Sequence, residues 1–154
     1  MSANYGKYSK CFERSIKHIF MNFLGEANIV PVVETENNDK VHCVWIEIEG
    51  SVEGVVVFKF LETTLKNIAE KLYPGALGKG KLSKQNARDI SGEIGNMITG
   101  TFANQLQYLN QEVLLNAPEF DEDPIPLKTL YENISFSYDT LFGEFDAEIY
   151  FREE

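Results

Sequence analysis

The sequence predicts an α/β fold of the α+β type, in which long helices pack on an antiparallel-rich mixed sheet. Residues 11–24 and 83–109 place apolar side chains at the three- and four-residue spacing of amphipathic helices. Residues 42–60 and 134–151 have the alternation of paired strands joined by short turns. The chain has 154 residues, and we predict a single domain over residues 1–154.

The first half of the chain predicts a helix, an edge strand, a strand pair and a second helix. The helical stripe of residues 11–24 ends at Gly25, a residue type common just beyond helix ends. Residues 29–33 form a short strand, and Pro31 places it at an edge or a bulge because proline cannot donate to the ladder. The remaining elements are a turn at residues 36–39, strands at 42–49 and 54–60, and a helix around 65–72 that stops before Pro74-Gly75.

The second half is built around one long helix. Residues 75–81 are a glycine-rich connector, and Ser83 has the side chain that an N-cap needs for a helix that runs to about Leu109. A short strand at 113–115 and an acidic, proline-bearing loop at 119–126 follow, and we assign no role to this loop. The chain closes with strands at 134–138 and 144–151 around a turn near Gly143, and the second strand alternates as if one face were buried.

The long helix contains an unusual run, residues 89–100, which holds three glycines. Each glycine inside a helix costs about 0.5–1 kcal/mol relative to alanine, so we infer that the helix surface must be free of bulk here. The core stripe is Ile90, Ile94, Met97, Ile98, Thr101, Phe102 and Leu109. The opposite side is predicted to carry Asp89, Glu93, Asn96, Gly100 and Ala103, with Gly92 beside them, so that Glu93 and Asn96 project together into solvent.

Two interpretations of this glycine-rich face stay open from the pattern alone. Polar residues on an exposed helix face are commonly solvated and have no further role. The glycines argue against an ordinary solvent face, which favours Ala, Lys, Glu or Gln. A flat patch with two protruding polar side chains suits the close approach of a partner surface better than a small-molecule pocket, which is concave and mostly apolar.

Charge limits the partners. The chain has 14 basic and 24 acidic residues and a net charge of −10, which argues against nucleic-acid binding. Lys79, Lys81, Lys84 and Arg88 are a local exception at the start of the long helix, where cations have the wrong sign for the helix dipole. These residues are either a solvated basic loop or a cluster that steers an acidic partner toward the glycine-rich face.

The remaining sequence features predict a cytoplasmic protein with no membrane contact. No apolar stretch reaches bilayer length, and no signal-peptide pattern is present at the N-terminus. Cys11 and Cys43 are expected to be reduced, buried thiols. Residues 75–80 lack a phosphate-loop pattern and residues 121–123 lack EF-hand spacing, so we expect no metal or cofactor in this chain.

The glycine-rich run also carries a family resemblance. Residues 92–100, with the sequence GEIGNMITG, resemble the signature helix of the CheC/CheX/FliY chemotaxis phosphatases and are most similar to that of CheX. Residues 46–58 are similar to the strand-turn-strand that precedes this helix in CheX, and the likeness covers most of the chain from about Val41 onward. CheC carries two copies of the Glu-x-x-Asn motif, but Asn104 and Glu112 do not repeat it here.

The resemblance implies a CheX-like phosphatase that hydrolyses the aspartyl phosphate of a CheY-type response regulator and so ends a chemotaxis signal. It implies that Asn96 orients the attacking water and that Glu93 pairs with the regulator's lysine, while the regulator supplies Mg²⁺ and this chain binds no cofactor. The expected partner contacts on this chain are Asp89, Gly92, Gly100, Ala103, Lys84 and Arg88. The resemblance also implies a homodimer formed through the sheets. The alternative is a non-catalytic adaptor that binds phosphorylated receiver domains or the flagellar switch.

Overall fold

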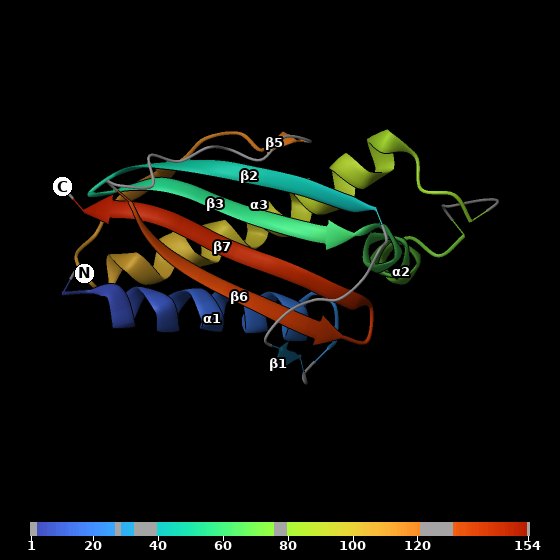
Figure 1. Cartoon of the computed structure of the whole chain (residues 1–154), viewed down its shortest axis with the longest axis horizontal. Helices are drawn as coiled ribbons and strands as arrows, with labels where there is room; N and C mark the ends of the chain where they lie inside the picture. The colour runs from blue at the N-terminus through green and yellow to red at the C-terminus, as the bar shows by residue number, and fades with distance from the viewer. Residues whose placement is uncertain (1–2, 27–28, 33–39, 76–79, 121–130, 154) are drawn as a thin grey trace.

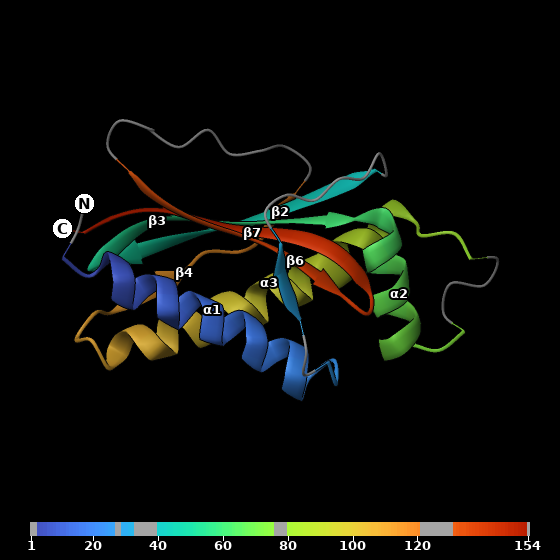
Figure 2. The same cartoon turned by 60° about the horizontal axis from the view of Figure 1, so that its bottom comes forward.

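The computed structural model describes residues 3–26, 29–32, 40–75, 80–120 and 131–153. In these residues one sheet carries two long helices on one face, and a third helix lies at one end of the sheet (Figures 1 and 2). The helices are α1 (Tyr5–Asn22), α2 (Glu62–Leu72) and α3 (Lys84–Gln107). The strands are β1 (Val30–Val32), β2 (Val41–Gly50), β3 (Val52–Leu61), β4 (Val113–Leu115), β5 (Glu119–Phe120), β6 (Glu132–Thr140) and β7 (Gly143–Glu153).

The sheet has the order β1-β6-β7-β3-β2-β4, with β5 also paired to β2. Every pairing between described strands is antiparallel, which agrees with the predicted antiparallel-rich sheet. Pro31 lies in β1, which pairs with β6 at the edge of the sheet, as predicted from its missing N–H. The two predicted strand pairs are the β2–β3 and β6–β7 hairpins.

One sequence prediction about the connections is wrong. Glu119 and Phe120 were predicted to begin a loop, but they form β5 and pair with Trp45 and Val44 of β2. Sheet pairing overrides the turn-like composition of the segment, because strand pairing depends on the neighbouring strand more than on local propensity. Residues 121–126 of the predicted loop, the predicted turn at 36–39 and the connector residues 76–79 lie outside the described residues.

The core lies between the sheet and the helices. Alternate residues of β7, namely Phe145, Ala147, Ile149 and Phe151, are each no more than 1% exposed, which confirms the buried face predicted from their alternation. Helix α1 packs Phe20 against Phe145, with the two rings stacked at a centroid distance of 4.9 Å. Burying side chains of this size stabilises the fold by about 1.5–3 kcal/mol each.

Helix α2 is fixed to the sheet by its direct connection to β3 and by two hydrogen bonds. Strand β3 passes directly into α2, because Leu61 is both the last residue of β3 and the N-cap of the helix. Thr64 Oγ1 donates to the carbonyl of Glu144 at 2.8 Å, and Asn67 Nδ2 donates to the carbonyl of Phe142 at 2.7 Å. Helix α2 is therefore held at the end of the sheet (Figure 2), and it also contacts α3.

Two further observations concern the cysteines and the described helices. Cys11 and Cys43 are buried and not joined in a disulfide, as predicted. No helix in the described ranges has both the length and the apolar character that crossing a bilayer requires.

Candidate functional site

Helix α3 carries the predicted site and is held by contacts on several sides. Ser83 is its N-cap, as predicted, and the Ser83 Oγ accepts the Asn86 N–H at 3.0 Å. The helix contacts β2, β3 and β4, runs beside α1, and meets α2 near its own N-terminal half. Four residues that are exposed or partly exposed follow one side of this helix, and we call them the ridge: Asp89, Glu93, Asn96 and Gly100.

The two polar side chains of the motif lie on this ridge, one helical turn apart. Asn96 is exposed, and none of the described residues forms a hydrogen bond with its carboxamide. Glu93 is partly exposed, and its Oε2 accepts a hydrogen bond of 3.3 Å from the hydroxyl of Tyr73. The structure thus confirms that both side chains reach the surface, where the carboxamide can donate and accept and the carboxylate can attract a cation.

The three glycines of the motif have three different surroundings. A Cβ at Gly95 would lie 3.2 Å from Phe58 and 3.4 Å from Val44, so this glycine brings α3 close to the sheet. A Cβ at Gly92 would lie 3.0 Å from the Phe120 ring of β5. A Cβ at Gly100 would meet no atom within 4 Å. Only Gly100 therefore keeps a free surface that a partner can approach.

The predicted placement of two small residues is wrong. Gly92 and Ala103 were expected on the open side of α3, but Gly92 is buried and Ala103 is only 8% exposed. The reason at Gly92 is that Pro118 and Phe120 pack over it. A period of 3.6 residues identifies one buried face, whereas α3 is covered on a second flank. The missed buried residues include Ser91, Gly95 and Thr99.

The residues of the basic cluster differ in their exposure. Lys81 and Lys84 are exposed near the start of α3, and Lys79 lies outside the described residues. Arg88 is partly buried, and its guanidinium lies over the Phe120 ring at 5.7 Å from the centroid. Arg88 thus helps to hold β5 against α3, and any role for Lys84 or Arg88 toward a partner stays a prediction.

A comparison with protein families decides the affiliation of the chain. The family model described as "Chemotaxis phosphatase CheX" matches residues 42–124, more than half of the chain. The matched region contains the whole ridge. The chain belongs to the CheX family. A comparison with curated proteins gave no match.

Solved structures of CheX proteins and their relatives share this fold. A CheX from Vibrio vulnificus is 18% identical, with a TM-score of 0.76 over 99% of this chain and 100% of that chain. The CheX in a CheX–CheY–BeF3–Mg²⁺ complex from Borrelia burgdorferi is 18% identical, with a TM-score of 0.70 over 95% and 98%. FliY of Thermotoga maritima is 16% identical, with a TM-score of 0.65 over 94% and 86%. At these identities the likeness is one of fold.

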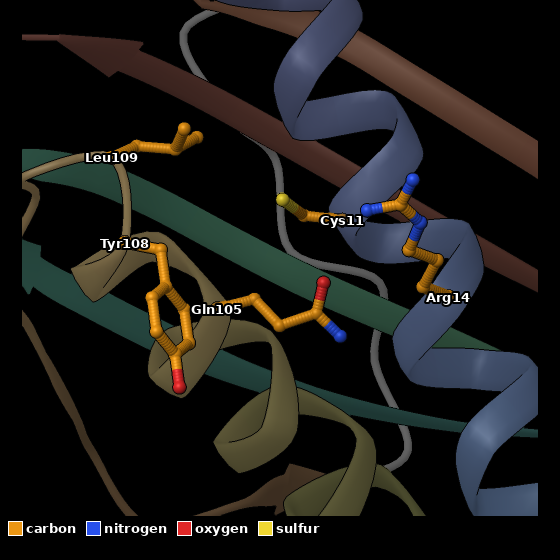
Figure 3. A pocket seen from close by; sticks show the side chains of 5 residues that line it. All are labelled: Cys11, Arg14, Gln105, Tyr108 and Leu109. Atoms are coloured by element: carbon orange, nitrogen blue, oxygen red, sulfur yellow. The ribbon is translucent and has the colours of Figure 1, made fainter.

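A hollow lies on the far half of α3 in this CheX-family chain, away from the ridge. It has a volume of about 420 Å³ and is lined by Cys11, Arg14, Gln105, Tyr108 and Leu109 (Figure 3). Gln105 lies nine residues beyond Asn96, or about 13 Å along the helix axis. Burial raises the pKa of the Cys11 thiol, although Arg14 opposes the shift, so the thiol stays protonated and unreactive at neutral pH. Nothing in this lining provides an activated nucleophile.

The side chains of the ridge and their neighbours can be compared with what a metal site needs. In the described ranges, no three side chains of His, Cys, Asp or Glu come together in a way that could hold a metal ion. Asp89 is exposed and its Oδ1 accepts from Gln85 Nε2 at 2.7 Å, so it too remains on the helix surface. The ridge thus presents the Asn96 carboxamide and the carboxylates of Asp89 and Glu93 on the surface of α3.

Proposed function

We propose that this chain is a protein-aspartyl-phosphate phosphatase that dephosphorylates a CheY-type response regulator and thereby ends a chemotaxis signal. Two findings support the proposal: the match to the chemotaxis phosphatase CheX, and the likeness to a CheX solved together with CheY, BeF3 and Mg²⁺. The observation that carries it on this chain is the exposed Asn96 carboxamide, one turn from Glu93 and without a hydrogen-bond partner among the described residues.

The proposed reaction is hydrolysis of an acyl phosphate. A water oxygen attacks phosphorus, the bond from phosphorus to the aspartyl oxygen breaks, and the products are the free carboxylate and inorganic phosphate. The regulator supplies the phosphoaspartate, the Mg²⁺ that offsets charge, and a lysine. Asn96 enters the regulator's site and orients the water, in the way that a glutamine does in other phosphoryl transfers.

Glu93 has the docking role in this proposal. Its carboxylate pairs with the regulator's lysine and sets the position from which Asn96 reaches the phosphoryl group. Gly100 allows close approach, because beyond the adjacent turns of α3 no atom of the described residues lies within 4 Å of where its Cβ would be.

The alternative is a non-catalytic adaptor that uses the same face to bind a phosphorylated receiver or the flagellar switch. The likeness in fold to FliY supports this alternative. The two functions are separated by incubating the protein with a receiver phosphorylated on aspartate and with Mg²⁺, and following the release of phosphate. Faster release than from the receiver alone supports the phosphatase, whereas co-purification at an unchanged rate supports the adaptor.

The same assay across the receiver proteins of one cell identifies the substrate, which neither sequence nor fold specifies. The homodimer and the cytoplasmic location stay predictions that rest on the resemblance and on composition. Sedimentation of the purified chain tests the homodimer directly.

A further inference from the structure

We propose that Tyr73 is a positioning residue that holds the Glu93 carboxylate in its docking orientation. The inference rests on the proposed function and deepens it. Tyr73 lies at the C-cap of α2, twenty positions before Glu93, and its hydroxyl donates to Glu93 Oε2 at 3.3 Å. This bond joins the C-terminal end of α2 to the ridge of α3.

The position of Tyr73 is determined by the fold. Helix α2 is tied to the β6–β7 turn by Thr64 and Asn67, through hydrogen bonds to backbone carbonyls. At its other end, the Tyr73 N–H donates to the carbonyl of Ala69 at 2.8 Å, and the Gly75 N–H donates to Glu70 Oε1 at 3.2 Å. Hydrogen bonds at Tyr73 and at Gly75 thus fix the backbone on both sides of the phenol, which points toward α3.

The hydroxyl is a dependable donor. The negative charge of Glu93 is the largest of the causes that raise the pKa of Tyr73, followed by desolvation, the hydrogen bond to Glu93 and the charge of Asp89. The phenol therefore keeps its proton at neutral pH and above. Because it donates to Oε2, the other carboxylate oxygen stays available for an ammonium group from the partner.

The expected benefit is preorganisation. A glutamate side chain on a helix surface samples several rotamers, and each rotamer-rich side chain that is immobilised on binding weakens association. A Glu93 that is already oriented by Tyr73 loses less freedom when the receiver docks. Loss of the Tyr73 hydroxyl should therefore raise KM and Kd for the receiver and leave kcat, which depends on Asn96 and the water, unchanged.

The test compares Tyr73→Phe with Tyr108→Phe. Tyr108 is a matched control because it is also a helix C-cap and is 88% exposed, but it lies at the far end of α3. Each substitution is made in the natural sequence and in a Glu93→Ala background. Affinity is measured for a Mg²⁺-bound receiver carrying BeF3⁻, which stands for the phosphoryl group, and kcat and KM are measured with the phosphorylated receiver.

We expect Tyr73→Phe to weaken receiver binding about three- to tenfold and to raise KM by the same factor, the loss expected for one unfixed side chain. We expect Tyr108→Phe to change neither. In the Glu93→Ala background Tyr73→Phe should have no further effect, because the group that it positions is gone.

Three results would overturn the inference. Unchanged affinity in Tyr73→Phe removes the role altogether. An equal loss with and without Glu93 shows that Tyr73 contacts the receiver by itself, and a fall in kcat at constant KM shows that it acts on the chemical step. If the unsubstituted protein has no affinity for the receiver, the proposed function fails first, and this is seen before any Tyr73 variant is compared.

Discussion

The sheet-facing side and the ridge side of α3 use glycine for opposite purposes. Gly95 lies against Phe58 and Val44, where a Cβ would be in tight contact at 3.2 and 3.4 Å. Gly100, five residues later, has open space where its Cβ would be. Both positions lack a side chain, but only the first is required by the packing of this molecule. In the proposed function, the glycine that this fold does not need, Gly100, serves the approach of the receiver.

The sharpest test of this contrast is Gly100→Lys. A Cβ at this position has open space and lysine favours helix more than glycine does, so we expect no loss of thermal stability. We expect phosphate release to fall to the rate of the receiver alone, because a long charged side chain on the ridge prevents docking. Gly6→Lys is the matched control, since Gly6 also lies in a helix with open space around it. Retained activity in Gly100→Lys would show that the ridge is not the contact surface.

Asn96→Ala tests the chemistry on the same ridge. We expect the dephosphorylation rate to fall about 10²-fold, the order seen when one positioned polar group is removed, while folding stays nearly unchanged. Asn104→Ala serves as the control, because Asn104 is an exposed asparagine on the same helix two turns further along. A rate near that of the unsubstituted protein in Asn96→Ala would count against the assigned role.

Gly95→Val tests the buried side. The added methyl groups must enter the contact with Phe58 and Val44, and overpacking of this kind costs about 1–3 kcal/mol. We expect a lower midpoint of thermal unfolding, measured by circular dichroism. An equal or higher midpoint would show that the sheet can move away from α3, and the distinction between the two glycines would be lost.

Gly100→Ala is the smallest change, and it should raise the midpoint of thermal unfolding, whereas Gly95→Val should lower it. Replacing a solvent-facing helical glycine by alanine stabilises a helix by about 0.5–1 kcal/mol, which raises the unfolding midpoint by roughly 1–4 °C in a chain of this size. We expect activity to decrease only slightly, because a methyl group adds little bulk. A destabilised Gly100→Ala would mean that this position is under a packing constraint.

Much of the architecture could be predicted from the sequence alone, because hydrophobic periodicity and the residues that begin or end an element are local properties. Ser83 marked the start of α3, Pro31 marked an edge strand, and the alternation in β7 identified its buried face. The outward direction of Glu93 and Asn96 also followed from spacing, since residues three apart share one side of a helix.

The tertiary structure alone decided what surrounds the ridge. Phe120 covers Gly92, and Tyr73 reaches Glu93 across twenty positions, and neither contact has a spacing that a helical period can reveal. The amphipathic pattern of α3 shows one buried stripe, but the number of flanks covered depends on where β5 and α2 are placed by the sheet. The sequence by itself determined the helix and its two outward polar side chains, because these depend on neighbours a turn away. The exposure of each glycine and the hydrogen bond to the Glu93 carboxylate depend on segments that are far apart in the sequence and meet only in the folded chain.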